Sequence, residues 1–316
     1  MARVAVIIPV YNGAETVAEA IESVLAQTYR DFELIAVNDG STDSTAEVLE
    51  RFAGSIKIVT RPNGGISAAR NSGLRESYSE YVALLDCDDT WMPAMLERTV
   101  AALERDSSCV MAYTNLSVTD SNGRPLNTAL VGPEVAHAPS FDEMFMRLWP
   151  IMPSAVVIRR TALDAIGGFA EEFRSYGFED AYCWMRLREL GPFAYIDERL
   201  GNWRFSPYPR PIKNFSFSPE ARAMFTQLVR ERWGRSVEPL LRSRARASRS
   251  ILGYIGLTEL SNGNKQQARE AFRRALQLDP RRFKNYLRYL RTYLPTGLAR
   301  ALSGRTATKS PNAAAR

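Results

Sequence analysis

Short runs of apolar residues alternate with helix-like segments through the first 115 residues of the chain. The runs typical of buried strands lie at residues 4–10, 32–38, 56–60, 81–86 and 109–115. Helical patterns lie at residues 17–25, 66–74 and 92–105, and a capping-box pattern of Ser44 and Glu47 starts another helix. Such alternation is the signature of a parallel sheet whose strands are joined by crossover helices.

The alternation breaks down after residue 115. Asn122-Gly123 has the composition of a hairpin turn, residues 154–159 have a strand pattern, and residues 178–190 a helical one. From about residue 218 onward the pattern is almost entirely helical. We therefore expect an α/β fold, a mainly parallel sheet flanked by helices, followed by an all-helical C-terminal region. The expected divisions are residues 1–215, residues 216–304 and a small, polar, disordered tail at residues 305–316.

Histidine and cysteine are scarce, which restricts the chemistry. His137 is the only histidine among 316 residues, and the three cysteines are widely spaced without a CxxC pair. A serine or cysteine hydrolase triad would have to use His137, and neither a histidine-rich zinc site nor a disulfide framework is indicated. A metal would bind mainly to oxygen atoms, which favours Mg²⁺ or Mn²⁺.

Charge is distributed unevenly along the chain. Residues 1–200 contain 17 Lys and Arg against 29 Asp and Glu, whereas residues 201–316 contain 24 against 6. The acidic first part argues against a nucleic-acid groove there. The N-terminal segment is typical of a strand rather than a signal peptide, and no run approaches the about 18 apolar residues of a membrane span. We therefore expect a soluble protein of a reducing compartment.

Polar and acidic residues follow three of the predicted strands, at the sheet edge where ligands bind to open parallel sheets. Tyr11 and Asn12 follow the first strand, Asp39 the second, and Asp86-Cys87-Asp88-Asp89 the fourth. Asp86 and Asp88 lie on the same side of an extended segment, where their charges repel unless a cation lies between them. The alternative is an Asp-rich turn that caps the helix near Met92, but the position after a buried strand favours a metal site.

Five segments taken together resemble the inverting family 2 glycosyltransferases, which have the GT-A nucleotide-sugar-binding fold. They are Pro9-x-Tyr11-Asn12, Asn38-Asp39-Gly40-Ser41-Thr42-Asp43, Asn63-Gly64-Gly65-x-x-x-Ala69-Arg70-Asn71-x-Gly73, Asp86-Cys87-Asp88-Asp89 and Glu179-Asp180. The resemblance covers about residues 3–206. No GxGxxG follows the first strand and no P-loop sequence occurs, so the dinucleotide-binding and P-loop alternatives lack their phosphate loops.

The resemblance assigns the nucleotide-sugar donor to eight residues, Pro9, Tyr11, Asn12, Asp39, Arg70, Asp86, Asp88 and Arg204. It implies that Tyr11 stacks on the base and that Asp39 accepts the imide hydrogen of a uracil-type ring, whereas the alternatives are a core aromatic and a helix cap. Arg70 would lie near the base or the phosphates. Asp86 and Asp88 would form the metal-binding pair, with Asp86 at the ribose or a metal-bound water and Asp88 on the Mn²⁺ or Mg²⁺ that bridges the diphosphate.

Asp180 is the catalytic residue that the resemblance implies. It would remove the proton of the acceptor hydroxyl while the metal neutralises charge on the departing nucleoside diphosphate, and attack would invert the anomeric carbon. The alternative is a carboxylate that favours the dipole at the start of the helix at 178–190. The motifs that precede Asp180 favour its role as a base.

Two positions depart from the family pattern. Asn38-Asp39 stands where relatives often have two acids, a mild change because the second residue makes the base contact. Ser206 follows Arg204 where many relatives have a histidine near the metal or diphosphate, which leaves a third protein ligand for the metal open. Arg204 could still meet the diphosphate, while His137 lies in an unrelated loop as a solvated residue.

The helical region contains two distinct segments. Residues 248–280 resemble a tetratricopeptide-like helix pair, and since solenoids need about three repeats, packing on the catalytic domain or a partner subunit is favoured over peptide recognition. Residues 281–294 form a basic amphipathic helix. A contact with an anionic membrane surface and a homodimer contact both fit this pattern.

The resemblance thus implies a metal-dependent, inverting, hexosyltransferase-type enzyme. It would move a sugar from a UDP-linked donor to a hydroxyl of a glycan or lipid-linked saccharide, with Mn²⁺ or Mg²⁺ as cofactor. The expected setting is polysaccharide biosynthesis for the cell envelope, in the cytoplasm and at the inner face of the membrane. One alternative is a non-catalytic GT-A scaffold or nucleotide-sugar sensor that acts through its helical region, against which the intact acidic residues count. Another, a sugar nucleotidyltransferase, would need a Gly-rich basic loop after the first strand, and residues 11–14 are not one.

Overall fold

The computed structural model describes residues 2–120, 123–130, 137–146, 151–173, 178–204, 219–237, 260, 265–278 and 283–294. Contacts divide the chain into two units, Met1–Met144 with Trp149–Val237 and Phe145–Leu148 with Glu238–Arg316, and each is described by itself. The domain division expected at residue 215 stays a prediction, because residues 205–218 lie outside the described ranges.

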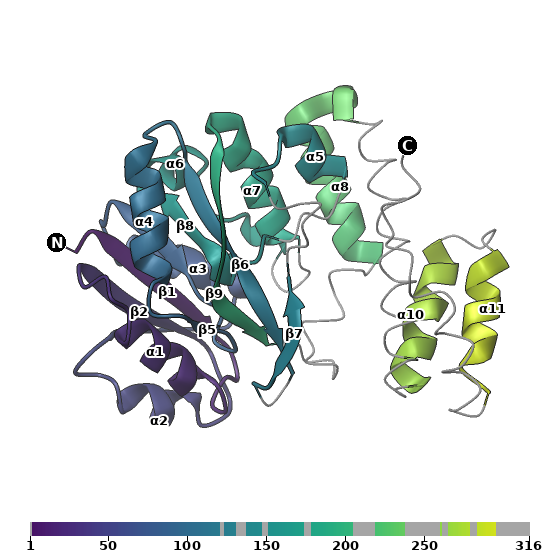
Figure 1. The fold of residues 1–316 in the computed structure, drawn as a ribbon, viewed down its shortest axis with the longest axis horizontal. Coiled ribbons are helices and arrows are strands. Elements are labelled where there is room, and N and C mark those ends of the chain that lie inside the picture. Colours follow the sequence, from purple (N-terminus) through teal and green to yellow (C-terminus); the bar gives the residue numbers. More distant parts are fainter. Residues whose placement is uncertain are drawn as a thin grey trace. The chain divides into compact units, whose positions relative to one another are not determined.

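The first unit is built on one mixed sheet with the strand order β3-β2-β1-β4-β8-β6-β9-β5, and β7 pairs with β6 (Figure 1). The strands are β1 (Val4–Val10), β2 (Phe32–Asp39), β3 (Lys57–Arg61), β4 (Tyr81–Leu84), β5 (Thr90–Trp91), β6 (Met111–Thr119), β7 (Pro125–Ala129), β8 (Val156–Arg159) and β9 (Phe193–Arg204). The strands β3, β2, β1 and β4 are parallel, as their alternation with helices predicts. Beyond them β8 is antiparallel to both β4 and β6, so the sheet becomes mixed.

Helices flank this sheet, and their buried faces follow the predicted periodicity. In the first unit they are α1 (Val17–Leu25), α2 (Thr45–Glu50), α3 (Ile66–Arg75), α4 (Met95–Arg105), α5 (Phe141–Met146), α6 (Arg160–Ala165), α7 (Glu179–Leu190) and α8 (Pro219–Trp233), with short 3₁₀ turns η2 (Pro153–Ala155), η3 (Glu171–Phe173) and η5 (Gly234–Val237). Helix α3 lies close to β1 because Gly73 faces Ile7, where an added Cβ would come within 2.5 Å of Cγ2. The α/β fold class predicted from the sequence is confirmed.

The predicted capping box at the start of α2 is wrong. Ser44 makes no side-chain hydrogen bond to the helix end. Instead, Oδ1 of Asp43 accepts hydrogen bonds from the backbone N–H of Thr45 at 3.0 Å and from its hydroxyl at 2.5 Å. Oδ2 of Asp43 also accepts from the N–H of Ala14, so the start of α2 is tied to the turn after β1.

Helix α8 packs on other helices of the first unit through aromatic rings. The centroid of the Phe225 ring lies 5.2 Å from that of Phe178, and the Trp233 ring lies 5.8 Å from Tyr182 and 5.6 Å from Phe141. These contacts place α8 against the residues at the start of α7, which carries the predicted catalytic carboxylate.

The second unit contains the helices α10 (Lys265–Leu278) and α11 (Phe283–Arg291), which pack on each other around Leu260, Ala268 and Phe272. Of the tetratricopeptide-like pair expected at 248–280, only residues 260 and 265–278 are described, and the tail at 305–316 lies outside the described residues, so both stay predictions. Within the part of the chain that the structure describes, no helix is both long and apolar enough to cross a membrane.

Candidate active site

The turns that follow β1 and β2 are joined by hydrogen bonds of Asn12. The Asn12 N–H donates to the hydroxyl of Ser41 at 3.0 Å, and Oδ1 of Asn12 accepts from the N–H of Thr42 at 2.8 Å. Asn12 has a left-handed backbone with φ of 50°, which asparagine tolerates better than most residues. The neighbouring Tyr11 is 39% exposed, while Pro9 is buried within β1. The donor contacts of these three residues stay predictions.

Asp39 is buried at the end of β2 and anchors the turn that precedes α3. Its carboxylate accepts hydrogen bonds from the N–H groups of Gly64, at 3.1 Å, and Gly65, at 2.8 Å, and it pairs with Nε of Arg61 at 3.4 Å. The alternative of a simple helix cap therefore describes part of what Asp39 does, since Gly65 precedes the first residue of α3. Its contact with the base stays a prediction.

Arg70 is the centre of the site and is completely buried. Its Nη2 donates to Asp86 Oδ1 at 2.9 Å and its Nη1 to Glu179 Oε1 at 3.1 Å, while its guanidinium lies over the ring of Phe169. Burial alone would lower the pKa of Arg70, but the charges of Asp86 and Glu179 raise it. Arg70 thus joins residues 86–89, the acidic turn after β4, to the first turn of α7. The contact of Arg70 with the base or phosphates that the resemblance implies stays a prediction.

Glu179 is a site residue that the sequence reasoning did not single out. Burial, followed by the charge of Asp180, raises the pKa of Glu179 to about 7, and Arg70 acts in the opposite direction. The only signal in the sequence was its position beside Asp180. A carboxyl in this setting titrates together with its neighbours.

Asp180 occupies the first turn of α7, next to Glu179. Its Oδ1 accepts a hydrogen bond from the N–H of Ala181 at 2.6 Å, and its charge acts on both Arg70 and Glu179. The preceding residue, Phe178, has a left-handed backbone with φ of 70°, which is costly for a bulky side chain. The charge of Asp180 thus acts on the buried Arg70 that also binds Asp86, while the role of Asp180 as a base stays a prediction.

Asp89 is a second residue that the sequence reasoning did not assign. It is buried, and its carboxylate accepts hydrogen bonds from the hydroxyl of Ser154 at 2.5 Å and from the N–H of Arg204 at 2.9 Å. Burial, together with the charges of Asp88 and Asp86, raises the pKa of Asp89 well above its usual value. The Ser154 hydroxyl also accepts from the N–H of Asp86 at 3.1 Å, so these two residues hold the acidic turn against β9 and η2.

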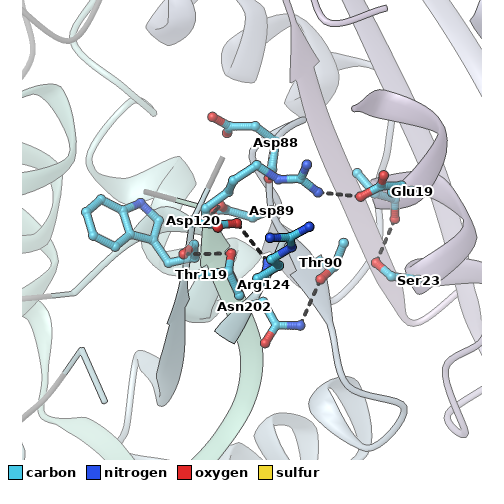
Figure 2. Close-up of polar contacts among 12 residues, drawn as sticks. Glu19, Ser23, Asp88, Asp89, Thr90, Thr119, Asp120, Arg124 and Asn202 are labelled. Carbon is cyan, nitrogen blue, oxygen red and sulfur yellow. Dashed lines mark hydrogen bonds and ion pairs between the residues drawn. The ribbon is translucent and has the colours of Figure 1, made fainter. Parts of the chain in front are cut away.

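Arg204 borders the acidic turn at the end of β9. Its Nε donates to the carbonyl of Asp88 at 3.0 Å, and its guanidinium forms an ion pair with Glu19 of α1. Figure 2 shows Glu19, Asp88 and Asp89 among the polar contacts of this region. This position is compatible with the contact to the diphosphate, which stays a prediction. Ser206 lies outside the described residues.

His137 lies apart from these acidic residues. Its Nε2 is 3.2 Å from Oε1 of Glu143, and its carbonyl accepts a hydrogen bond from the hydroxyl of Tyr113 at 2.8 Å. Its side chain is about half exposed. His137 therefore lies in the loop before α5, and it was not among the predicted site residues.

Among the described residues, no group of three or more His, Cys, Asp or Glu side chains is arranged to hold a metal ion. In the acidic turn, Asp89 is bound by Ser154 and the backbone of Arg204, and Asp86 by Arg70. The pair to which the resemblance assigns a cation is Asp86 and Asp88, and Asp86 also pairs with Arg70. Magnesium is commonly bound by one or two carboxylates together with substrate phosphates, so this pair fits such an ion when a diphosphate is also bound.

Glu179→Gln is expected to make the free energy of unfolding less dependent on pH. A carboxyl with a raised pKa in the folded state stabilises the fold below about pH 4.5, and that effect is lost as the pH rises through about 7. We expect this loss, of about 1–3 kcal/mol in the natural protein, to disappear in the variant. Urea unfolding at pH 5 and pH 8 measures it. The exposed Glu172, changed to Gln, is the control, and equal pH slopes for all three proteins would contradict the prediction.

The chain is similar to proteins of one known family. The model of the family described as "Glycosyl transferase family 2" matches residues 5–167. An uncharacterized glycosyltransferase of Rickettsia typhi is 34% identical over 203 residues, which are 62% of this chain and 62% of that protein. The putative glycosyltransferase EpsE of Bacillus subtilis is 29% identical over 234 residues, 72% of this chain and 82% of EpsE. The chain thus spans less than two thirds of the length of the Rickettsia relative.

Solved structures show the same fold at low sequence identity. TarS residues 1–349 of S. aureus has a TM-score of 0.60 at 18% identity, covering 92% of this chain and 90% of that one. The same protein in complex with UDP-GlcNAc has a TM-score of 0.57 at 18% identity, over 92% and 79% of the two chains. The mannosyltransferase PcManGT of Pyrobaculum calidifontis, in complex with GDP-Man and Mn²⁺, has a TM-score of 0.55 at 18% identity, over 96% and 84%. With a GT-A-like fold, and with more than half of its length matched by the family model, this chain belongs to glycosyl transferase family 2.

Proposed function

We propose that this protein is a metal-dependent, inverting glycosyltransferase that moves a sugar from a UDP-linked donor to a hydroxyl of a glycan or lipid-linked saccharide, in the assembly of a cell-envelope polysaccharide. The observation that carries the proposal is the buried Arg70, which joins the acidic turn to the first turn of α7 through two ion pairs. Relatives in complex with UDP-GlcNAc, or with GDP-Man and Mn²⁺, support a nucleotide-sugar donor.

In this proposal the donor nucleotide binds at the ends of β1 and β2. The exposed ring of Tyr11 offers a face on which a base can stack, and the interlocked turns around Asn12 keep that ring in place. The Asp39 carboxylate is fixed by two backbone N–H groups, so it can accept a further hydrogen bond from the imide of a uracil-type ring without reorienting.

Asp86 and Asp88 are the residues that would hold the cation, together with oxygen atoms of the donor diphosphate. A bound Mg²⁺ or Mn²⁺ would supply charge neutralisation for the departing nucleoside diphosphate. Arg204 adds a positive charge at this turn, because its Nε is bonded to the carbonyl of Asp88. Asp89 keeps the turn in shape through Ser154 rather than by contact with the donor.

Asp180 is the proposed general base. A carboxylate at the start of α7 can accept the proton of an acceptor hydroxyl as its oxygen attacks the anomeric carbon from the face opposite the leaving diphosphate, which inverts that carbon. The bond from the N–H of Ala181 to Oδ1 orients the carboxylate for this step. Arg70 and Glu179 hold the beginning of α7 against the acidic turn, so the base and the donor site share one rigid support.

Donor hydrolysis tests the proposed function without knowledge of the acceptor. The purified protein is incubated with Mn²⁺ and a panel of UDP-, dTDP- and GDP-sugars, and release of the nucleoside diphosphate is measured. Slow hydrolysis of one UDP-sugar, abolished by Asp180→Asn, is the expected result. Binding of a UDP-sugar without hydrolysis or transfer to any supplied glycan would favour the alternative of a nucleotide-sugar sensor.

UDP binding is expected to depend on the divalent cation through Asp88. We expect the affinity for UDP to fall by about tenfold or more in EDTA, because the diphosphate must otherwise approach the carboxylates of Asp86 and Asp88 without a cation. Asp88→Asn should lower UDP affinity in Mn²⁺ and remove the effect of EDTA. Calorimetric titrations measure both, with Asp164→Asn as a control at an exposed carboxylate of α6. An EDTA effect of unchanged size in Asp88→Asn would contradict the assignment.

A further inference from the structure

Helix α11 carries three large apolar side chains on an exposed face. Tyr286, Leu287 and Leu290 lie within about one turn on one side of the helix, and Leu287 is 46% and Leu290 60% exposed. Single exposed leucines are ordinary, but three large apolar residues that share one face form a continuous surface. We call these three residues the outer face of α11. Tyr293 follows the helix and is also exposed, but its ring lies against the guanidinium of Arg269 in α10.

The side of α11 that contacts α10 is more polar than the outer face. Thr292 is fully buried there, and its hydroxyl accepts a hydrogen bond from Nε of Arg269 at 3.3 Å. Tyr289 is partly buried against the small core of the unit. The helix is therefore held to its own unit through Tyr289 and Thr292 and leaves Leu287 and Leu290 outside, the reverse of the orientation that burial of apolar surface would favour for an isolated unit.

The charge of the sequence segment that contains the outer face favours one kind of occupant. From residue 281 to the end, the chain contains nine Lys and Arg and no Asp or Glu. Three of these, Lys284, Arg288 and Arg291, lie within α11. A second copy of the same segment would bring positive charges together, whereas a surface of anionic lipid headgroups complements them. Basic residues beside an apolar helical face supply the two signals, electrostatic and hydrophobic, that a helix needs to bind at a membrane interface.

We propose that α11 binds the surface of an anionic membrane, with Leu287 and Leu290 inserted among the headgroups and the basic residues of the segment against the phosphates. This inference goes beyond the proposed sugar transfer and does not depend on it, because its readout is binding to lipid. A soluble catalytic unit attached in this way would act on acceptors that are anchored in the same membrane.

Co-sedimentation of the full-length protein with vesicles tests the proposal. We expect binding to phosphatidylcholine vesicles that contain phosphatidylglycerol at low salt, weaker binding at high salt, and little binding to phosphatidylcholine alone. Leu287→Gln with Leu290→Gln should lower the partition coefficient by about tenfold or more, because the apolar contribution is lost while the charge is kept. Arg288→Gln with Arg291→Gln should reduce mainly the salt-dependent part.

Leu190→Gln is the matched control, since Leu190 is a leucine of similar exposure, 47%, in the first unit. It should bind vesicles as the natural protein does. Failure of the full-length protein to bind anionic vesicles at low salt would overturn the proposal, and so would equal binding to neutral vesicles. If light scattering shows that the double leucine variant halves the molar mass while vesicle binding is unchanged, the outer face is a dimer contact and the proposal is wrong.

Discussion

Asp180→Asn is expected to lower kcat by about 100-fold or more while the affinity for the donor stays nearly unchanged. Asparagine keeps the shape of the side chain, and its Oδ1 can still accept the hydrogen bond that Asp180 accepts from the N–H of Ala181 at 2.6 Å. The amide cannot take a proton from an acceptor hydroxyl at neutral pH, so the loss falls on turnover. Steady-state kinetics together with calorimetric titration of UDP separate the two quantities.

The control for this variant is a carboxylate at the start of another helix. Asp142 lies exposed in the first turn of α5, so Asp142→Asn removes a charge with the same relation to a helix dipole outside the site. A dipole contribution is worth about 0.3–1 kcal/mol of stability and has no reason to affect turnover. Near-normal kcat in Asp180→Asn, with a small loss of stability in both variants, would return Asp180 to the helix-dipole interpretation.

Arg70→Met is expected to lower the free energy of unfolding by about 3–5 kcal/mol. Methionine fills much of the volume of the arginine side chain, but it leaves the buried Glu179 without its counter-charge. The larger cost is therefore the isolated carboxylate rather than a cavity. Urea unfolding at neutral pH measures the loss. Arg98→Met, which removes an exposed ion pair with Glu198, should cost only about 0–1 kcal/mol.

A double variant separates the ion pair from packing. Arg70→Met with Glu179→Gln removes both charges, and we expect it to be about 1–2 kcal/mol more stable than the sum of the two single changes predicts. Asp86 is about a quarter exposed, so water can compensate part of its lost contact with Arg70. Strictly additive free energies for the two changes would show that Arg70 and Glu179 do not interact in the folded protein.

The strands of the parallel part of the sheet were the most predictable elements. Every residue of β1 is buried, and a strand buried on both faces must be apolar throughout, which makes it visible in the sequence. The spacing of apolar residues in α1 likewise predicted its buried face, because one side of this helix meets the core and the other meets solvent.

Local polar geometry was less predictable. The sequence pattern of a capping box is present at Ser44 and Glu47, but the box does not form. Asp43 makes the contacts at the start of α2 instead, and it also binds the N–H of Ala14. That second contact joins residues 29 positions apart in the chain. A rule based on neighbouring residues cannot predict this contact. In the folded protein, Asp43 binds both Ala14 and Thr45, and Ser44 does not cap the helix.

The predicted site residues came from segments that each end a strand or begin a helix. That reasoning identified Asp86, Asp88 and Asp180 by residue type and position, but it passed over Glu179 and Asp89, which stand directly beside them. Both are buried, and what they do depends on partners far along the chain, Arg70 for Glu179 and Ser154 for Asp89. The only signal in the sequence was that Glu179 and Asp89 stand next to predicted site residues. Their burial, which the sequence does not show, makes them structural partners of Arg70 and Ser154.

The sequence by itself determined the sheet and brought its acidic residues to one edge, because strand periodicity and the chemistry of strand ends are local properties. Only the tertiary structure decided how those residues are used. Arg70 is an internal counter-charge because two carboxylates, 16 and 109 positions away, meet it where water is excluded. Likewise, the outer face of α11 is exposed, whereas Thr292, the residue after the helix, is buried and bonded to Arg269 of α10. Burial and ion pairing depend on contacts between distant segments, so which side chains are buried or paired is decided only when the chain folds.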